Sequence, residues 1–363
     1  MISRRISLPR RVACAAALAA VVALGHVAHV RAVDVALPAA IGDEEFWRLT
    51  SEFSERAGTF QSDNLLSNER DLQQVIPDLQ RGAGDTSVYL GVGPEQNFTY
   101  IAAVRPKMAF IIDIRRGNFD LHLMYKALFE LSADRAEFVS RLFARKRPEG
   151  LTATSSAAEI FEAFARVEPT DGLYSQNMRA IVRHLTRTHG FVLSSADTLR
   201  LQHIYTAIST YGPTIQYSTS QNAGRWRSTE PTYRDLMVAT DRSGQARGFL
   251  ASEESFAFLK KFETDNLLVP LIGNFAGPHA IRAVADYIRR RGGTVSAFYF
   301  SNVEEYLKQD GLWRDFCENV AALPLTPTSA FVRAVRDGRP GAGFALTNEV
   351  GSLGESFKSC SDE

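Results

Sequence analysis

The chain is poor in cysteine, with three in 363 residues: Cys14, Cys317 and Cys360. No group of cysteines and histidines has the spacing of a structural zinc site, so we predict no bound metal. Three histidines fall in expected helices without a shared metal-ligand spacing: His184, His189 and His203. Two cysteines lie beyond the N-terminal segment, and they are compatible with one disulfide in an oxidising compartment or with two reduced thiols.

The chain also lacks a net charge and, beyond its first 32 residues, a long apolar run. Its 41 basic and 41 acidic residues cancel, which argues against a strongly basic surface for nucleic acid. With 45% hydrophobic residues, we expect a soluble globular protein with a small-molecule ligand, no nucleic-acid partner and no stable membrane insertion after signal cleavage. The sequence does not indicate an oligomeric state.

Residues 1–32 have the pattern of a secretory signal peptide. Arginines precede an apolar run from Val12 to Val30, and a small-x-Ala cleavage site follows directly. The alternative is an uncleaved membrane anchor, which the Ala-rich and interrupted run disfavours. Ser3-Arg4-Arg5 loosely resembles a twin-arginine signal, although Ser7 stands where that signal has a bulky apolar residue. We expect a periplasmic or secreted protein of bacterial source.

Alternating strand and helix patterns predict an α/β fold. We expect a Rossmann-like, mostly parallel sheet with helices on both faces, interrupted by a long helical insertion. The chain then divides into a signal peptide, the N-terminal helices with the first β-α-β half, the helical insertion and loop, the second half, and a flexible tail: residues 1–32, 33–118, 119–232, 233–337 and 338–363.

Two local expectations belong to this division. Glu44–Leu79 has a helical pattern, with an apolar face near its start. Leu236–Thr240 and Ala246–Leu250 have the pattern of two strands that pair as a hairpin around Asp241–Gly244.

The most informative motif lies between Ser87 and Asp113. A short apolar strand leads into Gly91-Val92-Gly93, a helix follows, and a second strand, Met108–Asp113, ends in a carboxylate. Glycines let the backbone turn sharply and approach a ligand closely, and the N–H groups at a helix start favour anionic ligand atoms. A carboxylate at the end of the second strand can accept hydrogen bonds from a ribose diol. This order is typical of a nucleoside-binding site.

The motif is incomplete, however. A dinucleotide fingerprint has a third glycine where this chain has Gln96, and Pro94 stiffens the turn. An ordinary turn from a strand into a helix that begins at Pro94-Glu95 is the alternative explanation. The sequence also has no Gly-x-Ser-x-Gly elbow, and no catalytic residue is assigned.

On these residues the chain resembles the class I S-adenosylmethionine-dependent methyltransferase superfamily. The matching residues are Tyr89–Gly93 for the first motif and Ile111–Asp113 for the acidic end of the second strand. The chain is also similar to a bacterial branch, of no settled activity, that carries the stretches found here at Gly91–Phe98 and Phe300–Leu307. The resemblance implies S-adenosylmethionine as cofactor, with its carboxypropyl group near the two glycines and its ribose near Asp113.

The candidate binding residues come from the segments expected to meet beyond the carboxyl ends of the strands. Five are assigned to a cofactor: Gly91, Gly93, Glu95, Asn97 and Asp113. Three are assigned to a substrate: Arg115, Asn274 and Ser301.

Several of the polar residues have a structural alternative. Glu95 and Asn97 can cap the helix that follows, Arg115 can pair with Asp113 instead of a ligand, and His122 is expected on a helix surface. The segment Tyr211–Tyr233 is either a lid over a planar ligand or a packed surface loop.

We therefore expect an exported methyltransferase-fold protein that binds a small polar or nucleoside-like ligand between Gly91 and Asp113. The alternatives are an active S-adenosylmethionine-dependent methyltransferase and a non-catalytic envelope protein that binds a partner.

Overall fold

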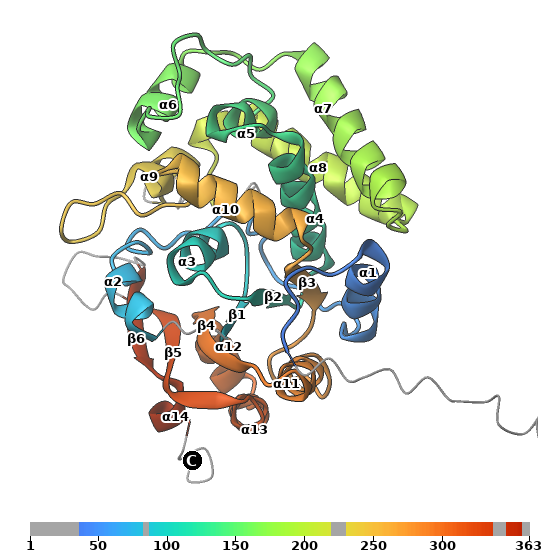
Figure 1. Ribbon diagram of the computed structural model, residues 1–363, viewed down its shortest axis with the longest axis vertical. Coiled ribbons are helices and arrows are strands. Elements are labelled where there is room, and N and C mark those ends of the chain that lie inside the picture. The colour runs from blue at the N-terminus through green and yellow to red at the C-terminus, as the bar shows by residue number, and fades with distance from the viewer. Residues whose placement is uncertain (1–35, 83–86, 219–229, 337–345, 358–363) are drawn as a thin grey trace, which may run out of the picture. The chain divides into compact units, whose positions relative to one another are not determined.

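A six-stranded sheet organises the part of the chain that the computed structural model describes, residues 36–82, 87–218, 230–336 and 346–357 (Figure 1). The order across the sheet is β3-β2-β1-β4-β5-β6. Strands β1 to β5 run parallel, and β6 pairs antiparallel with β5. The Rossmann-like, mostly parallel sheet is thereby confirmed. The strands are β1 Ser87–Gly91, β2 Met108–Asp113, β3 Leu268–Ile272, β4 Thr294–Ser301, β5 Leu325–Arg336 and β6 Leu346–Ser352.

Helices cover both faces of the sheet, which explains the continuous apolar runs of its strands. Every residue of β1, β2 and β3 is buried, as expected for a parallel sheet between two helical layers. Figure 1 shows three helices on one side, α3 Gln96–Val104, α4 Arg116–Leu131 and α10 Glu253–Thr264. The other side carries α11 Ala280–Arg290, α12 Val303–Gln309 and α13 Trp313–Ala321.

The long connection between β2 and β3 contains a further helical layer. It packs on α4 through α5, α7 and α8 and lies farther from the sheet than α4 and α10 (Figure 1). Its elements are α5 Arg135–Leu142, α6 Ala157–Ala165, α7 Asp171–Arg183, the π-helix η2 His184–Thr188, α8 Ser195–Tyr211, the 3-10 helix η3 Gly212–Thr214 and α9 Tyr233–Val238. All the described residues belong to one compact unit with this layer included.

The segment before β1 differs from the expected helix over Glu44–Leu79. The structure has α1 at Asp43–Glu52, then an irregular segment, then α2 at Ile76–Leu79 and the 3-10 turn η1 at Gln80–Gly82. The apolar face near the start forms α1, but residues 58–68 contain a glycine, two serines, two asparagines and an aspartate, which favour turns over helix. Asn64 has a φ of 44°, a left-handed conformation that a helix does not contain.

The expected hairpin over Leu236–Thr240 and Ala246–Leu250 is wrong. Tyr233–Val238 forms α9, which begins with a capping box of Thr232 and Asp235. Each of these two side chains accepts a hydrogen bond from the other's backbone N–H, which favours helix over a short strand.

The tail is more ordered than expected. Residues 346–352 form the antiparallel edge strand β6, and α14 follows at Leu353–Ser356. Phe357 packs against Phe316 and Trp313 of α13, so aromatic contacts hold this end of the chain on the sheet.

Some expectations fall on residues that the structure does not describe. The signal peptide at 1–32, residues 338–345, Cys360 and the centre of the candidate lid at 219–229 lie outside the described residues. Cys317 is buried on α13 and is disulfide-bonded. Within the described segments, no helix combines the length and the apolar character needed to cross a bilayer.

Candidate functional site

A cavity of about 370 Å³ lies at the carboxyl ends of the central strands. Strand order reverses between β1 and β4, because β2 and β3 follow on one side and β5 on the other. Ligands of open α/β sheets bind outside the strand ends at such a reversal. Residues from the turn after β1, the end of β2, the loop after β3 and the end of β4 all line the cavity.

The structure brings together five of the eight candidate residues on the cavity wall: Gly93, Asp113, Arg115, Asn274 and Ser301. The other three, Gly91, Glu95 and Asn97, lie behind this wall and are buried.

Asn97 holds the glycine turn from behind. Its Nδ2 donates to the carbonyl oxygens of Val92, Gly93 and Pro94 at 2.9, 3.1 and 2.8 Å, and its Oδ1 accepts from the Tyr89 hydroxyl at 2.8 Å. A Cβ at Gly91 would lie 2.0 Å from this Oδ1. Gly91 is therefore needed for the approach of Asn97. Gly93 is required for a different reason, since its φ is 75°.

Glu95 joins this turn to the loop before α2. Its carboxyl accepts from the backbone N–H of Ser67 at 3.2 and 3.3 Å, and the side chain is fully buried. Burial raises the pKa of Glu95 to about 8, although the Ser67 N–H acts in the opposite direction. At neutral pH the group is therefore mostly protonated.

Asp113 and Arg115 form a buried ion pair at the end of β2. Asp113 Oδ1 accepts from the backbone N–H and Nε of Arg115 at 2.9 and 3.0 Å, and its Oδ2 accepts from Nη2 at 2.6 Å. Arg115 Nη1 also donates to the carbonyl of Asp63 at 2.5 Å. The structural alternative for this pair is thus realised. The charge of Asp113 is balanced inside the protein before any ligand binds.

A second acid, which the sequence did not single out, lines the same cavity. Glu69 Oε1 accepts from the hydroxyls of Tyr299 and Ser301 at 2.5 and 2.6 Å, and its Oε2 accepts from Asn348 Nδ2 at 2.5 Å. Burial raises the pKa of Glu69, while these three donors lower it. Gln96 Nε2 donates to the Tyr299 hydroxyl at 2.8 Å, which links this cluster to the turn after β1.

Ser301 is held in an unusual backbone conformation at the end of β4. Its φ of 52° is left-handed, which a non-glycine residue adopts at a cost and which is enriched at functional sites. This conformation turns the chain away from the direction of β4, and the Ser301 hydroxyl donates a hydrogen bond to Glu69. Asn302, at the N-terminus of α12, makes no side-chain cap bond to this helix.

The side chain of Glu55, just after α1, holds the loop after β3 in place. Glu55 accepts from the backbone N–H groups of Asn274, His279 and Ala280 at 3.0, 2.8 and 2.9 Å. It thereby satisfies the N–H groups of His279, the N-cap residue of α11, and of Ala280, the first residue of the helix. Asn274 lies on the cavity with its Oδ1 accepting from Ala276 N–H at 3.0 Å.

His122 is buried rather than exposed, contrary to the expectation. Its Nε2 donates to the Gly93 carbonyl at 2.9 Å, and burial lowers its pKa to about 4. The ring is therefore neutral and supports the glycine turn from α4. Tyr217, from the candidate lid segment, lies on the cavity wall.

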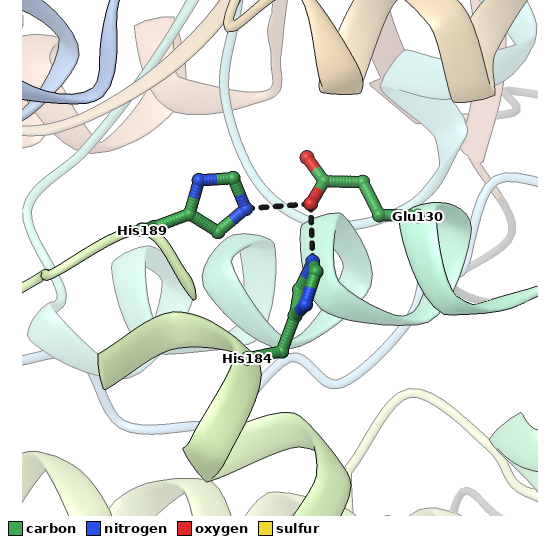
Figure 2. A group of neighbouring side chains, drawn as sticks. All are labelled: Glu130, His184 and His189. Carbon is green, nitrogen blue, oxygen red and sulfur yellow. Dashed lines mark hydrogen bonds and ion pairs between the residues drawn. The ribbon is translucent and has the colours of Figure 1, made fainter. Parts of the chain in front are cut away.

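A separate group of side chains has the composition of a metal site. Glu130, His184 and His189 place one donor atom each within 4.8 Å of one another (Figure 2). None of the three lines the cavity. An i, i+5 pair of histidines does not share a face of an α-helix, and the sequence pattern therefore gave no signal for this group.

The strand order and the cavity at its reversal define a Rossmann-like α/β protein. The chain belongs to a family described as a domain of unknown function, DUF7790, whose model matches residues 65–356. This range contains the sheet, the cavity acids and the Glu130 group. A comparison with curated proteins found no match.

Proposed function

We propose that the chain is an exported methyltransferase-fold protein that binds a small polar or nucleoside-like ligand without a phosphate group in the cavity at the ends of β1 and β4. The observation that carries the proposal is the cavity itself, which lies at the reversal of strand order and is lined by Gly93, Asp113 and Ser301. A volume of about 370 Å³ is within the range of small-molecule sites.

The two cavity acids supply acceptors for ligand hydroxyl groups. A carboxylate offers about four acceptor positions. Asp113 and Glu69 each use three of them in the hydrogen bonds described above. One oxygen of each acid, Oδ2 of Asp113 and Oε2 of Glu69, receives a single donor among these bonds. A ribose diol donates two hydrogen bonds and suits such a pair.

The charge of the wall argues against a phosphorylated ligand. Arg115 is the cation of this wall that the sequence assigned to an anionic substrate group, and it is committed to Asp113 and the Asp63 carbonyl. At the start of α11, Glu55 already accepts from the N–H groups of His279 and Ala280. We therefore favour a nucleoside, or a nucleoside that carries a sulfonium or thioether group, over a nucleotide. S-adenosylmethionine, a sulfonium, is the ligand that the resemblance implies.

Thermal-shift titration of the purified protein tests this proposal. S-adenosylmethionine, S-adenosylhomocysteine and adenosine are compared with adenosine monophosphate. A ligand at 100 times its Kd stabilises the folded state by about 2.7 kcal/mol. We expect one of the first three to raise the melting temperature and the monophosphate to have a smaller effect.

Matched variants locate the binding. Asp113→Asn and Glu69→Gln are expected to remove the ligand-induced shift, whereas Asp286→Asn, an exposed aspartate on α11, keeps it. No shift with any of the three ligands, or an equal shift in all variants, would contradict the proposal. Export is checked separately, because the N-terminal sequence of protein from a periplasmic extract is expected to begin at Val33.

A further inference from the structure

We propose that Glu130, His184 and His189 form a binding site for one divalent first-row transition-metal ion, for which Zn²⁺ is the probe. The site lies between α4 and the π-helix η2, and it is independent of the ligand cavity. Two imidazole nitrogens and one carboxylate oxygen are a common three-ligand set for Zn²⁺, which leaves a fourth position for water.

The donor atoms already converge. Glu130 Oε2 lies 2.5 Å from His184 Nε2 and 2.6 Å from His189 Nε2 (Figure 2). Bonds of about 2.0–2.2 Å to Zn²⁺ keep tetrahedral ligand atoms about 3.4 Å apart. The oxygen and the nitrogens therefore need to separate by less than about 1 Å, which small side-chain rotations provide.

The π-helix puts both histidines on the same face. The backbone N–H of His189 donates to the carbonyl of His184 at 3.1 Å, an i to i+5 bond. In an α-helix, five residues rotate about 500°, so the two rings would point about 140° apart. The wider turn brings residue i+5 back over residue i, and both rings face Glu130 (Figure 2). Such π segments are rare and are frequent at functional sites.

The outer contacts orient the ligands as metal sites require. His189 Nδ1 lies 2.7 Å from Asp43 Oδ1, which also accepts from Asn266 Nδ2 at 2.9 Å. With the Nδ1 proton donated to this carboxylate, Nε2 presents its lone pair toward Glu130. Lys126 Nζ holds the other Glu130 oxygen, Oε1, at 2.8 Å. Oε2 is thereby the oxygen left for the metal.

The opposing explanation is a metal-free cluster of ion pairs. In that cluster both Nε2 atoms carry protons and donate to Glu130, and His189 is an imidazolium between Glu130 and Asp43. It predicts no metal uptake. The side chains are partly reachable from solvent, with exposed fractions of 17% for His184 and 9% for His189, so an added ion has access to the group.

The experiment uses tag-free protein stripped of metal with a chelator. Calorimetric titration with Zn²⁺ is expected to give one ion per chain and a higher melting temperature. Substitution by Co²⁺ is expected to give the visible ligand-field bands of a four-coordinate site. X-ray absorption of the Zn²⁺ form is expected to show only nitrogen and oxygen ligands, two of them imidazoles. These readings need no variant.

The variants assign the ligands. His184→Ala, His189→Ala and Glu130→Gln are each expected to weaken Zn²⁺ binding more than 100-fold. Asp43→Asn, which keeps the ligands and changes only the outer contact, is expected to weaken it 10- to 100-fold. His203→Ala is the matched control, because His203 is exposed on α8 and lies outside the group; its affinity is expected to stay unchanged.

Three results would overturn the proposal. The first is the absence of a one-per-chain site for Zn²⁺ in the wild-type protein. The second is binding that persists unchanged in the folded ligand variants. The third is an X-ray absorption spectrum with fewer than two imidazoles, which holds even where a variant fails to fold.

Discussion

The cavity and the Glu130 group are both built from polar side chains that are buried or half-buried, but different elements assemble them. The cavity wall comes from the ends of parallel strands and from loops far apart in the sequence, such as Glu69, Asp113 and Ser301. The Glu130 group is built on α4 and the π-helix η2, whose donor atoms touch one another. The strand ends border a cavity of about 370 Å³, whereas the donor atoms of the Glu130 group lie within 4.8 Å of one another, a spacing that suits a single ion rather than a molecule.

The largest expected effect concerns the glycine turn after β1. Substitutions there test whether Gly91 is needed for a ligand or for the packing of Asn97. Asn97→Ala removes four buried hydrogen bonds and leaves the Tyr89 hydroxyl without its partner. We expect the free energy of unfolding to fall by about 3 kcal/mol, measured by denaturant titration.

A double mutant sharpens the same point. Gly91→Ala alone is expected to cost about 1–3 kcal/mol, because its Cβ would lie 2.0 Å from Asn97 Oδ1. In the Asn97→Ala background that atom is absent, so the cost is expected to be at least about 1 kcal/mol smaller. Gly172→Ala, in α7 with open space around its position, is the control and is expected to stabilise the protein slightly. Strictly additive costs would mean that Gly91 is not reserved for Asn97.

The pH dependence of stability distinguishes the two regions next. The pKa of Glu95 is raised to about 8 by burial, so the folded state holds a proton that the unfolded state releases near its ordinary pKa of about 4.3. Its contribution is fully present below that value and is lost as pH rises through 8, with a slope of up to about 1.4 kcal/mol per pH unit. Glu263, buried with a pKa of about 8, acts with the same sign.

The contribution of Glu130 to stability depends on pH in the opposite direction. Burial raises its pKa, but hydrogen bonds to His184 and His189 and the charge of Lys126 lower it further, to below its ordinary range. In metal-free protein its contribution is present above that range and is lost as pH falls. Denaturant titrations from pH 3 to 9 should therefore show that Glu95→Gln flattens the alkaline loss, and that Glu130→Gln flattens the acidic loss, which begins below the ordinary glutamate pKa of about 4.3. An unchanged alkaline slope in Glu95→Gln would show that Glu95 is ionised in the folded protein.

The sequence predicted the cavity better than the Glu130 group for a physical reason. Parallel strands place their carboxyl ends at one edge, so a strand pattern alone indicates which segments meet, and Gly93, Asp113, Asn274 and Ser301 do line one cavity. The π turn at His184 depends on packing against α4, which no local pattern specifies. Histidines five apart therefore carried no signal.

The other features that the sequence mispredicted or did not indicate also divide into those with a local signal and those set by tertiary contacts. The start of α9 had a local signal, the capping box of Thr232 and Asp235, which apolar alternation outweighed in the prediction of strands. Glu69 had none, because tertiary hydrogen bonds place it on the cavity, from Tyr299 and Ser301 of β4 and from Asn348 of β6. His122 occupies a helix position that becomes buried once α4 packs on the glycine turn.

The smallest expected effect compares two helix N-termini, that of α6 in the helical layer and that of α12 at the cavity. Ser156 forms a complete capping box with Glu159 at the start of α6, so Ser156→Ala is expected to cost about 1 kcal/mol. Asn302 stands at the start of α12 without a side-chain cap bond and lines the cavity. Asn302→Ala is therefore expected to change the free energy of unfolding by less than about 0.5 kcal/mol.

The same Asn302→Ala protein is expected to bind the proposed ligand less tightly, because Asn302 does not cap its helix and lines the cavity. Paired denaturant and thermal-shift titrations of Ser156→Ala and Asn302→Ala measure both quantities. Ser156→Ala is expected to lower stability and leave ligand binding unchanged. Asn302→Ala is expected to leave stability nearly unchanged and weaken ligand binding. If Asn302→Ala costs as much stability as Ser156→Ala, then Asn302 serves the fold, and the cavity edge is not specialised for binding.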